Sequence, residues 1–279
     1  MTTLSIRFDI DTLACIEQGV PALLRLAQEL GVRFSFYINM GYSFNLRNAL
    51  SRFRKGAESN NIVKLTPIEK LGLRKFLKTI ILNPPVGASN ISMLERIVEE
   101  GHELGLHGGF DHTQWQHFLP EQRNGGFTEM FDQAYVLYKK YFGAPAGFCS
   151  PGFKHNAMVY GLLQEYNFSY VSDLCGDHPI AKAEFGGKQF SMNQIPVNLV
   201  APYSVPILEY YYALEMPTPQ IITEVSHKIE NRDFAVFYGH PCFEGKKGLA
   251  IMRQFLVSLV KTREIIPMSQ LNERFFKEL

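Results

Sequence analysis

The chain has 279 residues, of which 46% are hydrophobic and 20% are charged, and this composition excludes a disordered or fibrous protein. Its formal net charge of +1 at pH 7 provides no general basic field for binding nucleic acid. The 4 cysteines are scattered and form no C-x-x-C pair, which argues against a disulfide scaffold and is typical of a reducing compartment.

The first predicted elements alternate between strand and helix. Residues 4–8 form a short apolar run that is typical of a strand. Residues 16–30 follow with apolar side chains at helical spacing, and Gly31 stands where a helix should end. Residues 32–38 then predict a second strand.

The segment 45–90 differs from the rest of the chain because it holds nine basic and two acidic residues. Within it, Thr66 and Glu69 form a capping box, which predicts a helix that starts at Pro67. This helix is amphipathic, and its apolar stripe is formed by Leu73, Phe76, Leu77, Ile80 and Ile81, while Lys70, Arg74, Lys75 and Lys78 lie off the stripe. The stripe could pack on the protein's own core, or residues 66–82 could lie on an anionic membrane surface.

The remaining chain continues the alternation. The predicted elements are a helix at 90–100, a strand at 103–107, a helix at 128–142, a strand at 146–149, a helix at 156–166, a strand at 168–172, a helix at 219–230, a strand at 234–238, a helix at 247–261, and a final strand and helix. Such alternation predicts an α/β fold with a parallel sheet, either open or closed into a barrel. No linker or repeat divides the chain, so we expect a single domain over residues 1–279 with a basic amphipathic insertion at about 45–90.

Two aspartates stand at the end of the first predicted strand. Asp9 and Asp11 are two residues apart, so both carboxylates lie on the same side if the strand continues. The carboxyl ends of barrel strands are where such folds build their sites, and two close carboxylates can divide the work of holding a cation and exchanging protons. The pair could also simply cap the segment that follows.

Because Asp9 and Asp11 stand where a signal peptide would need its apolar stretch, we expect no secretion signal and a cytoplasmic protein.

A group of histidines follows the strand at 103–107. His107 and His112 are five residues apart, so they would diverge on a regular helix and can converge only if the backbone between them is irregular. Gly108-Gly109 permits such a backbone. With the two aspartates, they predict a metal site of imidazole and carboxylate ligands. His102 and His117 are expected at the surface.

Three further positions follow predicted strands. His240 ends the strand at 234–238, which makes it a candidate general acid or a buried core imidazole. Asp173 could orient a catalytic group, and Pro151-Gly152 could shape a wall of the site. Both could equally be ordinary turn residues.

The order of these motifs resembles the polysaccharide deacetylases, the NodB-homology or carbohydrate esterase family four. The similarity extends over nearly the whole chain, and the branch it most resembles deformylates 4-deoxy-4-formamido-arabinose carried on undecaprenyl phosphate. The similar stretches are FDIDT, EQGVPALLRLAQELGVRFSFYINMG, HELGLHGGFDHTQWQ, SYVSDLCG, QIPVNL and VFYGHPCFEG. The resemblance implies a distorted (β/α) barrel that binds one divalent metal, zinc in the first place, with cobalt, manganese or nickel as alternatives.

The resemblance also implies the roles of individual residues. The metal ligands match Asp11, His107 and His112. Asp9 matches the catalytic base, His240 the catalytic acid, and Asp173 a residue that supports them. The expected contacts with substrate are Pro151, Gly152, Lys154 and Glu244.

Two departures from the family pattern concern the same site. The family usually spaces its two histidines by four residues, whereas this chain spaces them by five. The arginine usual in the third motif is replaced by Cys149 or Ser150, with Lys154 as a candidate substitute.

The function that these observations predict is metal-dependent hydrolysis of an N-formyl or N-acetyl group on an amino sugar, in lipid A modification. The substrate is expected to be lipid-linked, and the protein to sit peripherally on the cytoplasmic face of the inner membrane, without a nucleic-acid partner. Two alternatives remain. One is deacetylation of another N-acetylated glycan or a small amide, and the other is a catalytically silent barrel that binds a glycan or lipid carrier.

Overall fold

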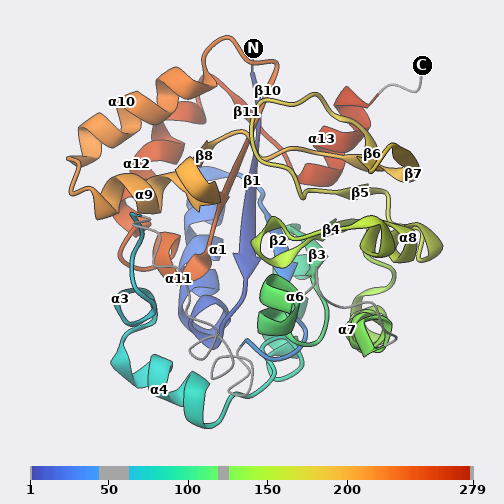
Figure 1. Ribbon diagram of the computed structural model, residues 1–279. Helices are drawn as coiled ribbons and strands as arrows, with labels where there is room; N and C mark the ends of the chain where they lie inside the picture. Colours follow the sequence, from blue (N-terminus) through green and yellow to red (C-terminus); the bar gives the residue numbers. More distant parts are fainter. Residues whose placement is uncertain (1, 44–62, 119–125, 277–279) are drawn as a thin grey trace.

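The structure is a computed structural model that describes residues 2–43, 63–118 and 126–276, so residues 45–62 of the predicted insertion lie outside it. A curled sheet forms its centre, with β1 as the long central strand of Figure 1. The strand order is β10-β1-β2-β3-β4-β5-β7-β6, with β11 also paired to β1. The strands are β1 (Thr3–Ile10), β2 (Ser35–Ile38), β3 (Glu103–His107), β4 (Gly147–Cys149), β5 (Tyr170–Val171), β6 (Ala181–Phe185), β7 (Lys188–Gln194), β10 (Phe234–Gly239) and β11 (Glu264–Ile265).

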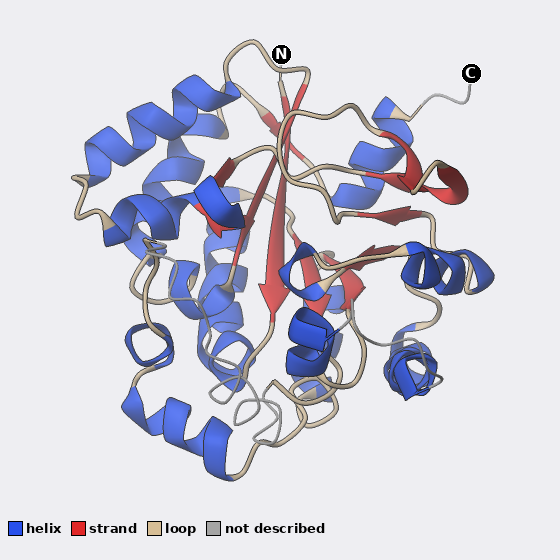
Figure 2. Ribbon diagram, in the orientation of Figure 1, coloured by secondary structure: helices blue, strands red, loops and turns tan. Residues whose placement is uncertain are grey.

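Helices surround this sheet (Figure 2), and α13 packs on its inner face through Met268 and Leu271. They are α1 (Val20–Leu30), α3 (Pro67–Leu71), α4 (Leu73–Ile81), α5 (Ile91–Glu99), α6 (His112–Phe118), α7 (Gly126–Phe142), α8 (Ala157–Glu165), α9 (Ile207–Ala213), α10 (Thr218–Ile229), α11 (Pro241–Glu244), α12 (Leu249–Leu259) and α13 (Met268–Phe275). None of the helices in the described part of the chain is long and apolar enough to cross a membrane.

The sheet is parallel from β10 to β7, and only the hairpin of β6 and β7 is antiparallel. The chain after β7 turns back toward the opposite edge, where Leu199 forms a bridge with Phe237 of β10. The sheet therefore curls toward closure without becoming a regular barrel. The predicted distorted (β/α) barrel is confirmed, whereas the β6–β7 hairpin and α9 were not predicted.

The two faces of the sheet differ in chemistry because side chains alternate along each strand. The outer face packs against the helices and is apolar; it consists of Leu4, Ile6, Phe8, Phe36, Ile38, Leu104, Leu106 and Phe237. The inner face is the concave side and is mostly polar; it includes Ser5, Arg7, Asp9, Ser35, Tyr37, Glu103, His107, Cys149, Tyr170 and Tyr238.

A hydrogen-bonded chain of side chains joins β2, β3 and β5 on the inner face. The hydroxyls of Tyr37 and Tyr170 lie 2.6 Å apart, and Tyr170 donates to Glu103 at 2.5 Å. Glycines make room for both rings, since a Cβ on Gly105 would lie 2.6 Å from Tyr37 and one on Gly147 would lie 2.2 Å from Tyr170. Burial raises the pKa of both phenols, so they stay protonated donors.

The predicted helix over 67–81 is broken into α3 and α4 at Gly72, whose φ of 77° no helix interior adopts. The capping box is confirmed, because the Thr66 hydroxyl accepts from the Glu69 N–H and the Glu69 carboxylate accepts from the Thr66 N–H. Along α4, Leu73, Leu77 and Ile81 are 61%, 45% and 74% exposed. Packing of the whole stripe on the core is therefore excluded.

One histidine differs from expectation. His102 was expected at the surface, but it is buried against Phe34 and Phe36, and its Nδ1 accepts from the Phe34 N–H at 3.0 Å. Burial lowers the pKa of His102 to about 4, so the ring is neutral near pH 7. The side chain of His117 lies outside the described part of the structure.

Candidate active site

The candidate site lies at the carboxyl ends of three strands. Asp9 is on the inner face near the end of β1, and Asp11 follows that strand directly. His107 is the last residue of β3, and His240 follows β10. Because these strands are parallel neighbours or lie one strand apart, their ends meet at the same edge of the sheet.

The loop between His107 and His112 explains how two histidines five residues apart can converge. His107 ends a strand and His112 begins α6, so the two belong to different elements. Gly108 has a φ of 69°, and a Cβ there would lie 2.6 Å from Pro151. The loop is also held from its other side, since the His112 N–H donates to the Tyr42 carbonyl at 3.0 Å. The centroids of the His107 and His112 rings lie 5.3 Å apart.

Asp11 stands at the centre of three histidines. Its Oδ1 lies 3.1 Å from His107 Nε2 and 3.4 Å from His112 Nε2, while its Oδ2 lies 3.4 Å from His240 Nε2. Burial alone would raise the pKa of Asp11, but His112 and His107 outweigh it and hold this pKa well below its usual range. The carboxylate is therefore ionised and available to a cation.

These residues fit a divalent metal. Within the described residues, Asp11 Oδ1 and His112 Nε2 are buried atoms without a hydrogen-bond partner, although they face one another. His107 Nδ1 lies 2.9 Å from the Cys149 carbonyl, which can only accept, so the proton sits on Nδ1 and the Nε2 lone pair faces Asp11. One carboxylate and two imidazoles form a ligand set typical of catalytic zinc with an open position.

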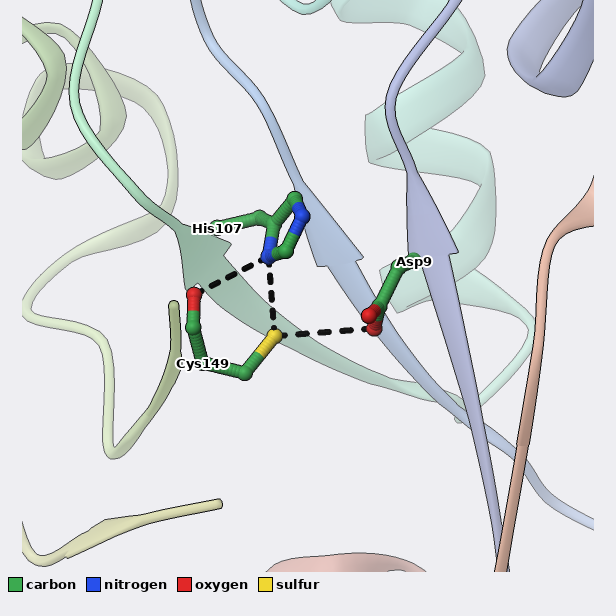
Figure 3. Close-up of side chains that lie close together, drawn as sticks. All are labelled: Asp9, His107 and Cys149. Atoms are coloured by element: carbon green, nitrogen blue, oxygen red, sulfur yellow. Dashed lines mark hydrogen bonds between the residues drawn. The ribbon is translucent and has the colours of Figure 1, made fainter. Parts of the chain in front are cut away.

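A second group of ligand-type residues lies on the other side of His107, as Figure 3 shows for Asp9, His107 and Cys149. The Cys149 sulfur is 3.0 Å from His107 Nδ1 and 3.5 Å from Asp9 Oδ1. This group suits a metal less well, because burial raises the pKa of the Cys149 thiol and a cationic side chain already occupies Asp9. The thiol instead acts as a weak donor behind the site.

The cation on Asp9 is Arg7, which sequence reasoning missed. The Arg7 guanidinium is fully buried and donates from Nε and Nη2 to the two Asp9 oxygens at 2.8 and 2.7 Å. Its Nη1 donates to the Ser172 carbonyl at 2.5 Å. Burial alone would raise the pKa of Asp9, but Arg7 and His107 outweigh this effect, so the pKa of Asp9 is lowered from its usual value. Spacing could have revealed Arg7, since it precedes Asp9 by two residues on a buried strand and so shares its face.

The cation that contacts Asp9 is Arg7, and not Lys154, which the sequence suggested as a substitute for an arginine. The Lys154 side chain is exposed, and its backbone carbonyl accepts from the Trp115 indole at 2.9 Å. Three rings surround the Arg7 guanidinium at centroid distances of 5.4 Å for Tyr37, 5.1 Å for Phe153 and 5.7 Å for Tyr238. A cation from β1, and not one from the segment after β4, therefore pairs with Asp9 in this chain.

Asp173 supports this arrangement from behind. It is buried, and its carboxylate accepts from the Ser150 N–H at 2.6 Å and from the Ser150 hydroxyl at 2.9 Å. Burial raises the pKa of Asp173. It fixes the turn that carries Pro151 and Gly152, of which Pro151 is buried and Gly152 is exposed.

His240 is held by a buried acidic group. The backbone N–H of His240 donates to the Glu244 carboxylate at 2.8 Å. Glu244 is fully buried, so it supports the backbone at His240 and is not an open contact for substrate. Glu209 lies close by and pairs with Lys70 of α3 at 2.7 Å. Burial and Lys70 lower the pKa of His240, against the opposing effect of Asp11.

Comparison with known proteins agrees with this geometry. No family model matches the chain. A probable 4-deoxy-4-formamido-L-arabinose-phosphoundecaprenol deformylase, ArnD, from Shewanella sediminis is 25% identical over 180 residues, which is 63% of this chain. The match spans 58% of that relative's length.

Solved structures show the same fold. The crystal structure of a putative polysaccharide deacetylase from Mycobacterium smegmatis superposes with a TM-score of 0.65 at 16% identity, over 98% of this chain and 90% of that one. The peptidoglycan deacetylase PdaC from Bacillus subtilis superposes with a TM-score of 0.55 at 11% identity, over 98% of this chain and 90% of that one. The resemblance to polysaccharide deacetylases and to their deformylase branch, stated above from motifs, is confirmed.

Proposed function

We propose that this protein is a metal-assisted hydrolase that removes a formyl or acetyl group from the nitrogen of an amino sugar. One observation carries this proposal: Asp11 contacts the imidazoles of His107, His112 and His240. Asp9, two residues before Asp11 in the chain, is held in place by Arg7. The similarity to proteins named as deacetylases and as a deformylase supports hydrolysis of an amide C–N bond.

The parts of the site divide the reaction between them. A divalent ion on Asp11, His107 and His112 would polarise the amide carbonyl and acidify the attacking water. Asp9 would accept the proton of that water, since Arg7 keeps it ionised and fixes its orientation.

His240 would protonate the leaving nitrogen, without which the amide would re-form. Its lowered pKa makes the imidazolium a stronger acid than an ordinary histidine, at the expense of a smaller protonated fraction near neutral pH. Backbone N–H groups near the metal would help to stabilise the oxyanion.

Metal analysis of the purified protein tests the proposal. We expect about one divalent metal per chain, zinc in the first place, lost in His107→Ala and His112→Ala and retained in His178→Ala, whose histidine is exposed. Asp9→Asn and His240→Ala should keep the metal but lose turnover of an N-formyl or N-acetyl amino sugar. A metal-free wild type after reconstitution with zinc, cobalt or manganese would contradict the proposal.

We further propose that the substrate is lipid-linked, of the 4-deoxy-4-formamido-arabinose-phosphoundecaprenol type, and that the protein works peripherally on the cytoplasmic face of the inner membrane. The support is α4, where Leu73, Leu77 and Ile81 form an exposed apolar row at helical spacing. The sequence adds basic residues beside this row, and α4 lies near the end of the sheet where β1 ends (Figure 1). This surface favours a lipid-linked substrate over a free glycan.

Vesicle binding tests the membrane contact. Leu77→Gln combined with Ile81→Gln should weaken cosedimentation with phosphatidylglycerol vesicles by roughly tenfold, because apolar area is lost from the interface. Val257→Gln is the matched control, since Val257 is 48% exposed on α12. Lys70→Glu is unsuitable, because Lys70 is paired with buried Glu209. Equal binding of wild type and double variant would remove the membrane role and leave the hydrolase proposal intact.

A further inference from the structure

An exposed aromatic residue lies on a strained turn near the candidate site. The strands β8 (Val200–Ala201) and β9 (Val205–Pro206) form a small antiparallel hairpin. At its tip, Tyr203 has φ 59° and ψ 27°, and Ser204 has φ 58°. Side chains with a Cβ rarely adopt this left-handed region, and glycine or asparagine usually occupies it.

The hairpin tip is fixed to the inner face beside His240. The Tyr238 hydroxyl donates to the Ser204 carbonyl, and the Tyr238 ring lies 5.8 Å from the His240 ring. Ala201 and Val205 on either side of the tip are buried. The strained backbone is thus held in place next to the wall that carries the candidate general acid.

Two aromatic residues with a positive φ lie on the two loops that contact Tyr238. Among the described non-glycine residues with positive φ, the aromatic ones are Phe153 and Tyr203. The Phe153 ring contacts the Tyr238 ring at 5.1 Å, so both loops meet at Tyr238. Backbone strain that surrounding contacts maintain is characteristic of functional sites.

The two aromatic side chains differ in what they contact. Phe153 packs over the Arg7 guanidinium, whereas Tyr203 is 74% exposed. None of the other exposed aromatics in the described part of the chain has a positive φ; Tyr141, for example, is 43% exposed on the regular helix α7. At position 203 a ring is displayed in a conformation that glycine would adopt more easily.

We propose that Tyr203 is a platform on which the sugar ring of the substrate stacks. This inference rests on the proposed function, and it adds a residue that contacts the sugar. An aromatic face binds the C–H face of a pyranose through apolar contact, and a rigid ring loses little side-chain entropy on binding. Because Ser204 at the tip bonds to Tyr238, whose ring neighbours that of His240, Tyr203 stands on the wall of the site that carries the candidate acid.

Substrate discrimination tests the platform. The probes are the methyl glycoside of 4-formamido-4-deoxy-arabinose and acyclic N-formylethanolamine, compared by kcat/KM in the zinc-loaded enzyme. Tyr203→Ala should lower the ratio of cyclic to acyclic kcat/KM by about tenfold, mainly through KM, and Tyr203→Phe should restore it. Tyr203→Gly should match Tyr203→Ala, which separates loss of the ring from relief of strain. Tyr141→Ala should keep the wild-type ratio.

The outcomes separate this inference from the proposed function. An unchanged ratio in Tyr203→Ala would overturn the platform while the hydrolase proposal stands. If the wild type cleaves neither probe, the hydrolase proposal fails, and NMR titration with the free amino sugar glycoside still decides the platform. Weaker binding to Tyr203→Ala than to wild type would support it, and equal binding would overturn it.

Discussion

The outer and inner faces of the sheet are made by the same strands and yet serve different purposes. On the outer face, Phe8 and Phe36 stack at 5.5 Å within the main core. On the inner face, the neighbouring Arg7 and Asp9 form an ion pair that is equally buried. Apolar burial stabilises the fold directly, whereas a buried ion pair must recover its desolvation through well-placed partners.

This difference shows how one strand can carry stability and chemistry at once. Successive residues of β1 point to opposite faces, so the outer set can be chosen for packing and the inner set for reactivity. Burial of the polar inner face costs little stability because its polar groups form hydrogen bonds. Arg7 donates to Asp9 and Ser172, and Glu103 accepts from Tyr170 and Ser35. At the strand ends, Asp11 and His112 keep unsatisfied atoms, which is where a ligand belongs.

The sharpest test compares two adjacent residues, Phe8 and Asp9. Phe8→Ala should lower the free energy of unfolding by about 3–5 kcal/mol while kcat per folded molecule is unchanged. Asp9→Asn should lower kcat by about 10³-fold while bound metal is retained. Urea unfolding, elemental analysis and steady-state kinetics on both variants give the answer. A Phe8→Ala protein that folds but loses its metal would show that the two faces are not separable.

The ion pair of the inner face can be tested by a double-mutant cycle. Arg7→Met leaves the Asp9 carboxylate buried without its cation and should cost about 3–5 kcal/mol of unfolding free energy. Adding Asp9→Asn removes that charge, so the double variant should be more stable than the sum of the two single effects predicts. Denaturant unfolding of the four proteins measures the coupling. Strict additivity would mean that Arg7 is not paired with Asp9 in the folded protein.

The sequence was sufficient to predict most of the residues that meet at the carboxyl edge of the sheet. Asp9, Asp11, His107 and His240 each end a strong strand signal, and Gly108 between the histidines indicated an irregular backbone. These signals are local, and the parallel topology brings them together without further information. The curled sheet followed from the same alternation of strands and helices.

The parts that were missed depend on distant contacts. The role of Arg7 follows from its pairing, although its spacing from Asp9 was visible in the sequence. The exposure of Leu77 could not be predicted, because an amphipathic stripe looks the same whether a core or a membrane covers it. His102 was misplaced because a lone histidine before a strand gives no sign that Phe34 and Phe36 will enclose it.

His102 offers a third test, because it is a titratable ring on the apolar outer face. Its folded pKa of about 4 lies below the ordinary value of 6.5, so the neutral form is favoured by folding. This stability is present above pH 6.5 and is lost as the pH falls toward 4. Lowering the pH from 7.5 to 4.5 should therefore cost about 2 kcal/mol through His102 alone.

The matched variant is His102→Asn, whose side-chain oxygen can still accept from the Phe34 N–H but does not titrate. Urea unfolding of both proteins at the two pH values isolates the histidine from the carboxylates that titrate in the same range. The variant should lose about 2 kcal/mol less than the wild type on acidification. Equal losses would mean that His102 is protonated in the fold, and hence that the outer face tolerates a charge.

The smallest effect is expected at Tyr37, which pairs in register with Asp9 of β1 but whose hydroxyl bonds to Tyr170 and not to the site. Tyr37→Phe removes one hydrogen bond to Tyr170 and keeps the ring beside Arg7, so it should cost only about 1 kcal/mol of unfolding free energy. Metal content and kcat should stay at wild-type values, and Tyr141→Phe on exposed α7 should change neither stability nor activity. Denaturation and kinetics on the two variants decide the matter. A tenfold loss of kcat in Tyr37→Phe would extend the reactive part of the inner face to the Glu103 network, which Tyr170 joins to Tyr37.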